Sequence, residues 1–209
     1  MTRFLISFLL LVFYSSGHAA NFDAFVATVG GVPAENVAVV LEPVTTVKLK
    51  RSANVTIAQV DREFTPFVTI VQTGTAIDFP NRDPIKHHLY SFSPAKPFEI
   101  KLYAGQPSTP IVFDKPGAVA LGCNIHDWME AYVLVVDSPY FGKTNSKGQA
   151  RVVNIPPGNY RLKIWHPRQK TQVLVRDMSI NAASAKLELI IDLAPRIVKT
   201  IPPLDTSEY

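Results

Sequence analysis

Cysteine is the scarcest informative residue in this 209-residue sequence, which contains one, Cys123. A lone thiol can be a buried inert side chain, half of an intermolecular disulfide, or a metal ligand. Charge is also sparse: Asp, Glu, Lys and Arg make up 18% of the residues, and no basic cluster with interleaved aromatic residues appears. These absences argue against a nucleic-acid partner. The 47% apolar fraction argues against disorder, so a folded core is expected.

No apolar run reaches the roughly 20 residues that a membrane-spanning helix needs. The one candidate, Phe4 to Tyr14, follows the positive start Met1-Thr2-Arg3 and precedes the small residues of 15–20. A basic, then apolar, then small-residue order is typical of a secretory signal peptide. We therefore expect residues 1–20 to be a signal removed after Ala19 or Ala20. The chain would then be exported, to the periplasm if the source has an outer membrane.

Motifs of hydrolytic enzymes are missing as well. The sequence has no G-x-S-x-G, no H-E-x-x-H and no convincing pair of carboxylates. Histidine is limited to five residues, one of which, His18, lies in the predicted signal. The remaining four are too few to build a second, catalytic copper centre beside a first metal site. We expect a protein that is not an enzyme.

No long stretch keeps a helical period, and 17 prolines and 10 glycines punctuate the chain. Short runs instead alternate with a period of two between turn residues, which is typical of an all-β sandwich or barrel. Such runs occur at 25–29, 37–41, 67–71, 77–79, 90–92 and 133–135.

A C-x2-H-x2-M loop runs from Cys123 through His126 to Met129, and about 35 residues upstream stands the pair His87-His88. One soft thiolate and two imidazoles, with a weak axial thioether, are the ligands of a type 1 copper site. Such a site suits both Cu(I) and Cu(II), so an electron can arrive without large rearrangement. The spacing therefore predicts one copper ion held by these side chains.

Residues 55–137 resemble the cupredoxins, a family that includes plastocyanin, azurin and amicyanin, and the short ligand loop is most similar to that of amicyanin. The segment from His87 to Phe98 resembles bacterial plastocyanin-like proteins described as "methylamine utilization protein". The resemblance implies a Greek-key cupredoxin barrel or sandwich over residues 48–137, with His87, Cys123, His126 and Met129 as copper ligands. It also implies transient redox partner proteins.

The sequence does not decide whether His87 or His88 is the first copper ligand. The family pattern N-x-D-x3-H, counted from Asn81 and Asp83, favours His87, whereas the alternative register places His88 on the metal. Adjacent strand residues point to opposite faces, so only one of them fits. Two departures from the family are notable: His88 replaces the usual Asn or Thr that ties the ligand loops together, and Leu121-Gly122 replace an aromatic residue before the cysteine.

A second β pattern surrounds this segment. The turn at 155–160 and the strand at 161–165 resemble a carboxypeptidase regulatory-like module, which is a transthyretin-like β-sandwich, and residues 25–41 supply its usual opening. Gly158 is expected to provide a positive φ in the turn. We therefore predict a small discontinuous sandwich from 21–47 and 138–194, and a flexible tail at 195–209.

The sequence favours a one-electron carrier. Two other classes remain: a protein that stores or delivers copper without electron transfer, and a structural or surface-binding module that needs no metal.

Overall fold

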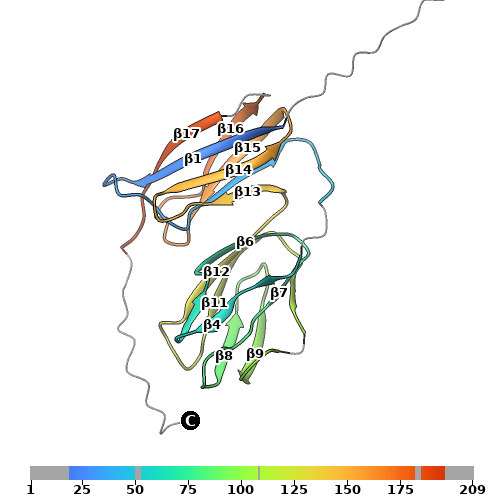
Figure 1. The fold of residues 1–209 in the computed structure, drawn as a ribbon, viewed down its shortest axis with the longest axis vertical. Coiled ribbons are helices and arrows are strands. Elements are labelled where there is room, and N and C mark those ends of the chain that lie inside the picture. Colours follow the sequence, from blue (N-terminus) through green and yellow to red (C-terminus); the bar gives the residue numbers. More distant parts are fainter. Residues whose placement is uncertain (1–18, 50–52, 108, 182–184, 196–209) are drawn as a thin grey trace, which may run out of the picture.

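The structure, a computed structural model, describes residues 19–49, 53–107, 109–181 and 185–195. The predicted signal at 1–20 and the predicted tail at 195–209 lie outside these residues, apart from Ala19, Ala20 and Pro195. Every regular element within the described ranges is a β-strand, and the strands form two stacked bodies (Figure 1). Within these ranges, no helix has the length and apolar character needed to span a membrane.

The upper body in Figure 1 is a sandwich of two sheets. One sheet has the order β14-β1-β17 and the other β13-β2-β15-β16. Their bounds are β1 Ala20–Thr28, β2 Ala38–Pro43, β13 Tyr140–Lys143, β14 Gln149–Ile155, β15 Gly158–Trp165, β16 Leu174–Ile180 and β17 Ala185–Ile191. Alternate residues of β1, such as Phe22 and Val26, face inward and pack against Leu41 and Leu162 of the second sheet, as a sandwich core requires.

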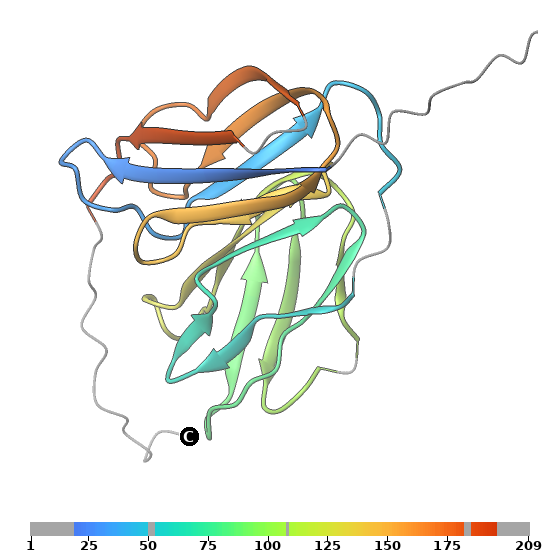
Figure 2. The same cartoon turned by 45° about the horizontal axis from the view of Figure 1, so that its top comes forward.

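The lower body carries the remaining strands. A five-stranded sheet, β6-β12-β11-β8-β9, faces a three-stranded sheet, β10-β7-β3, and a hairpin of β4 and β5 lies beside them (Figure 2). Their bounds are β3 Val55–Thr56, β4 Ala58–Val60, β5 Glu63–Thr65, β6 Val68–Gln72, β7 Thr75–Asp78, β8 His87–Ser91, β9 Phe98–Tyr103, β10 Ile111–Phe113, β11 Gly117–Gly122 and β12 Glu130–Val136. One core, which includes Phe79, Leu89, Phe113 and Val133, joins both sheets. The predicted all-β fold with two β-sandwiches is confirmed.

Each body has its own hydrophobic core. The upper core takes its buried residues from 20–41 and 150–191, and the lower core takes its residues from 57–135. The chain thus leaves the upper sandwich after β2 and returns to it at β13. That the two portions are separate domains stays a prediction, because a domain must also be able to fold alone.

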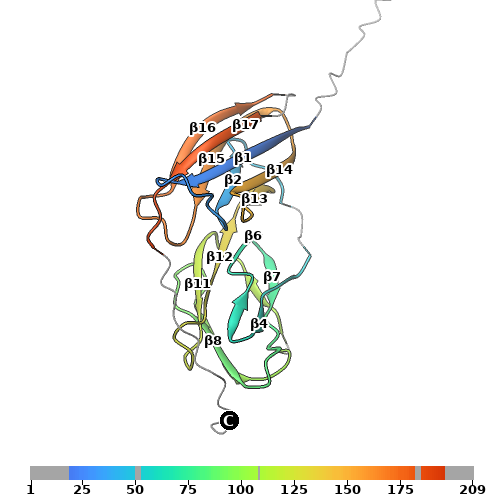
Figure 3. The same ribbon diagram turned by 60° about the vertical axis from the view of Figure 1, so that its left-hand side comes forward.

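The two bodies meet at a small apolar junction (Figure 3). Ala38 and Val40 of β2 and Val136 of β12 are buried together there, and Trp165 makes an edge-to-face contact with Tyr132. Trp165 therefore packs between the two bodies. β12 begins beside the loop 123–129, and both Tyr132 and Val136 along it contact the upper body.

The chain bends at Pro157 between β14 and β15, but the positive φ predicted at Gly158 was wrong. Gly158 is the first residue of β15 and is absent from the residues with positive φ, whereas Asn154 has a φ of 58°. A true left-handed glycine occurs at Gly148, which has a φ of 71° in the turn before β14. A Cβ atom at Gly148 would lie 2.4 Å from the carbonyl oxygen of Val26.

We expect Gly148→Ala to lower the free energy of unfolding by about 2 kcal/mol or more, because it combines a positive φ with a backbone clash. Gly158→Ala is the matched control, since its Cβ would meet only the Tyr160 ring at 3.6 Å. That change should alter stability by no more than about 0.5 kcal/mol. Urea denaturation measures both, and equal losses would contradict the assignment.

A second prediction concerns acid stability. His166 is 3% exposed, and burial together with the nearby Arg168 lowers its pKa from 6.5 to about 4. In the unfolded chain this imidazole takes up a proton near pH 6.5, whereas in the folded chain it stays neutral until about pH 4. The contribution of the neutral His166 to the free energy of unfolding is therefore complete above pH 6.5. It is lost as the pH falls toward 4, by up to about 3 kcal/mol. His166→Asn should flatten the fall in stability across this window in urea titrations, and an unchanged pH profile would contradict it.

Candidate metal centre

The ligand loop and the first histidine come from neighbouring strands of the five-stranded sheet. β11 ends at Gly122 and β12 begins at Glu130, so the loop 123–129 joins two antiparallel strands. β8 lies on the other side of β11, with Tyr90 opposite Gly122. His87 opens β8 at the same end of the sheet. Inside the loop, the Met129 N–H donates to the His126 carbonyl oxygen at 3.0 Å, which keeps the turn tight.

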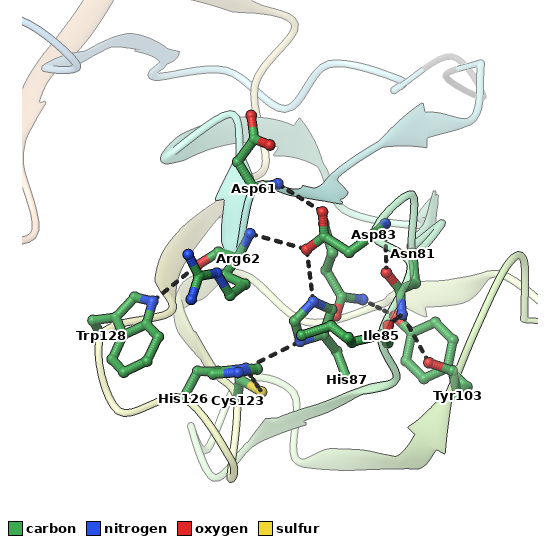
Figure 4. A network of polar contacts seen from close by, with 11 residues as sticks. Asp61, Arg62, Asn81, Asp83, Ile85, His87, Tyr103, Cys123, His126 and Trp128 are labelled. Atoms are coloured by element: carbon green, nitrogen blue, oxygen red, sulfur yellow. Dashed lines mark hydrogen bonds and ion pairs between the residues drawn. The ribbon is translucent and has the colours of Figure 1, made fainter. Parts of the chain in front are cut away.

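Three side chains converge at this end of the core: His87, Cys123 and His126 (Figure 4). Their exposed fractions are 0%, 4% and 3%. The two Nδ1 atoms are 3.1 Å apart, Cys123 Sγ is 3.8 Å from His126 Nδ1, and one donor atom from each residue lies within 4.8 Å of the others.

These separations suit a single ion. Bonds of about 2.0 Å to nitrogen and 2.3 Å to sulfur, arranged trigonally, place the nitrogens about 3.6 Å apart and the sulfur about 3.8 Å from each. His87 and His126 therefore need only small shifts to share one ion with Cys123. The donor set, one thiolate with two imidazoles, fits a soft transition metal such as copper.

Met129, the fourth predicted ligand, packs in the same part of the core as Cys123. It is 2% exposed, belongs to the same hydrophobic cluster as Cys123, and lines the same surface hollow of about 490 Å³. This position is compatible with a weak axial thioether and also with simple packing.

His88 points away from the three donors. Its Nε2 is 2.9 Å from Glu99 Oε1, and its ring lies beside that of Tyr90 on the opposite face of β8. The structure therefore gathers His87, Cys123 and His126 and leaves His88 out, which matches the register counted from Asn81.

A buried carboxylate fixes the far side of the first imidazole. Asp83 Oδ2 lies 2.7 Å from His87 Nε2, so a proton on Nε2 leaves Nδ1 free to bind a metal. Burial opposes ionisation of Asp83, but hydrogen bonds from the Arg62 N–H and from His87 keep the pKa of Asp83 below its ordinary value. The loop before His87 is shaped by Asn81, whose amide donates to the carbonyl oxygens of Ile85 and Tyr103 (Figure 4).

Burial, followed by repulsion from His87, lowers the pKa of His126 below its usual 6.5. A neutral imidazole is the form that binds metal, so this environment favours metal binding at neutral pH. Trp128 packs against His126 with ring centroids 5.0 Å apart, and its indole Nε1–H donates to the Arg62 carbonyl oxygen at 3.2 Å.

Sequence reasoning missed the tip of the β4–β5 hairpin. Asp61 and Arg62 have φ values of 54° and 59°, and their backbone N–H groups donate to the two oxygens of Asp83 at 2.7 and 2.9 Å. Two-residue hairpins of this kind usually contain Asn-Gly or Asp-Gly, so Asp-Arg gives little signal in the sequence.

No protein-family model and no curated protein sequence matches this chain. Solved structures match part of it. A copper-containing nitrite reductase (NirK) from Thermus scotoductus SA-01 is 25% identical with a TM-score of 0.38, over 46% of this chain, and the chain spans only 25% of that protein's length.

Two smaller proteins match over most of their own length. A Cu(I) structure of an amicyanin mutant is 12% identical with a TM-score of 0.37, covering 47% of this chain and 98% of amicyanin. A purple cupredoxin from Nitrosopumilus maritimus is 20% identical with a TM-score of 0.34, covering 41% of this chain and all of that protein. Since each TM-score is below 0.5, the assignment of the site depends on its own geometry.

Proposed function

We propose that this chain is an exported type 1 copper protein that carries one electron at a time between redox partner proteins. The observation that supports this most is the gathering of Cys123 Sγ and the Nδ1 atoms of His87 and His126 within 4.8 Å at a buried position. Copper, when bound there, supplies a one-electron couple between Cu(I) and Cu(II).

The residues of this chain have clear tasks in that role. Cys123 supplies the thiolate, and the two imidazoles supply neutral nitrogen donors. Met129 is proposed as the weak fourth ligand that tunes the potential. His87, Cys123 and His126 are each no more than 4% exposed, which leaves little room for a substrate to reach an ion held between them. This is the basis for proposing a carrier and not an enzyme.

Electrons would enter and leave through the ligand loop. His126 itself is buried, but its neighbour Ile125 is 40% exposed, so the edge of the loop presents one apolar side chain together with the exposed Asn124 and Asp127. Weak redox encounters need only a small interface of this kind. We propose transient protein partners at this edge.

The upper sandwich is proposed to be the carboxypeptidase regulatory-like module that the sequence suggests, and the whole chain to be related to the plastocyanin-like "methylamine utilization" proteins. Export also belongs to the proposal. Ala20 is buried as the first residue of β1, so cleavage after Ala19 would leave that strand whole.

Copper-loaded protein tests the function. We expect an intense blue absorption band that disappears on reduction, returns on oxidation and corresponds to one electron per chain. Cys123→Ser should lose the band because the thiolate is its source, yet keep its far-ultraviolet circular dichroism because serine is close to cysteine in size and shape. A colourless or weakly coloured complex with rapid copper exchange would instead support copper storage or delivery.

Partner binding and folding that persist without any coloured copper complex would support a structural module.

The ligand register gives a second prediction. His87→Gln should abolish the blue band, since it removes one of the three gathered donors. His88→Gln, the matched control one residue away, should keep the band because that ring faces Glu99. Copper titrations followed by absorbance measure both variants. Loss of the band in the His88 variant with retention in the His87 variant would reverse the assignment.

A further inference from the structure

The two segments that carry the metal ligands, 81–87 and 123–129, must be held together. In the proteins that this chain resembles, an Asn or Thr usually links them, and His88 stands at that position here. His88 faces away from the metal ligands and contacts Glu99. Without a tie, the segment 81–87 and the loop 123–129 would each have to be ordered when the metal binds. The conformational entropy lost in that ordering would weaken binding.

The tip of the β4–β5 hairpin contacts both segments (Figure 4). Toward the first, the N–H groups of Asp61 and Arg62 donate to the Asp83 carboxylate, whose Oδ2 also contacts His87 Nε2. Toward the second, the Arg62 carbonyl oxygen accepts the hydrogen bond of Trp128, whose ring packs against His126.

The tip is itself held in place. Val60 pairs with Glu63, and both tip residues have positive φ, which is the backbone of a type I′ turn. This conformation directs two successive N–H groups at one anion. The strand before the tip is bonded to the first ligand segment, because the Gln59 N–H donates to the Pro80 carbonyl and the Arg82 N–H donates to the Gln59 carbonyl.

We propose that the Asp61–Arg62 tip is a positioning element that clasps the two ligand segments, orienting His87 through Asp83 and His126 through Trp128 before the metal arrives. The inference rests on the proposed metal site. Asp83 also brings a negative charge next to a ligand, which favours the more positive oxidation state of the metal. Asp83 and Trp128 are therefore positioning residues that bind no metal themselves.

Three variants distinguish positioning of the metal ligands from a general contribution to the stability of the fold. Asp83→Asn removes the charge but keeps the size of the side chain. Trp128→Phe keeps a ring against His126 but removes the indole N–H. Asp61→Asn is the matched control, because it leaves the backbone N–H in place and Asn tolerates a positive φ.

The rate at which the loaded protein releases Cu(II) to excess EDTA measures how firmly the Asp61–Arg62 tip holds the two ligand segments. We expect Asp83→Asn and Trp128→Phe each to accelerate release by about tenfold or more, and Asp61→Asn by less than about twofold. The double variant should fall short of the product of the single effects, because both contacts meet at the backbone of Arg62. Asp83→Asn should also raise the reduction potential, whereas Trp128→Phe should leave it nearly unchanged.

Metal-free protein supplies the readout that separates failure of the clasp from failure of the proposed function. Nuclear magnetic resonance of the apo-protein should show His87 protonated at Nε2 with slow exchange of that proton, and should show the Trp128 indole proton protected. Asp83→Asn should lose the first signature and Trp128→Phe should broaden the His126 signals. If wild-type protein shows these signatures but gives no blue copper complex, the copper function fails and the clasp stands. Release rates equal to the Asp61→Asn control, with an unprotected His87 proton, would overturn the clasp.

Discussion

Burial of one thiol and two imidazoles at the same end of an apolar core is the constraint on which the rest of the site depends. A buried polar group without a partner costs about 1–3 kcal/mol, so these side chains are tolerable only where each has one. His87 has Asp83 on one side and His126 on the other, and Cys123 lies against His126. Moving any one of these side chains away would remove a contact that its neighbour makes in the core.

Strand pairing explains why the site forms where it does. Antiparallel pairing of β11 with β12 closes a short loop that delivers Cys123 and His126, and pairing of β8 with β11 brings His87 alongside. The period of two along β8 then sends His87 and Leu89 into the core and His88 and Tyr90 to the other face. β12 belongs to both regions: it begins beside the loop 123–129 and meets the upper sandwich through Tyr132 and Val136.

The parts of the structure that follow from local pattern were accessible from the sequence. Alternating apolar residues indicated the all-β fold, and the spacing from Cys123 to Met129 with the upstream histidine indicated the side chains that gather. The choice between His87 and His88 needed the register of β8. The hairpin tip at Asp61–Arg62 was not predictable, because its role depends on backbone groups and its residues are not those that favour a type I′ turn. Gly158 was misjudged for a related reason: Pro156-Pro157-Gly158 reads as a turn, but the strand resumes at the glycine and Asn154 takes the positive φ.

Electron paramagnetic resonance of the Cu(II)-loaded protein tests the central claim most directly, because the spectrum reports whether the thiolate shares the unpaired electron. The account predicts a narrow parallel hyperfine splitting, the signature of a copper ion bound to Cys123 with His87 and His126. A wide splitting, typical of tetragonal copper held by nitrogen and oxygen ligands, would contradict it.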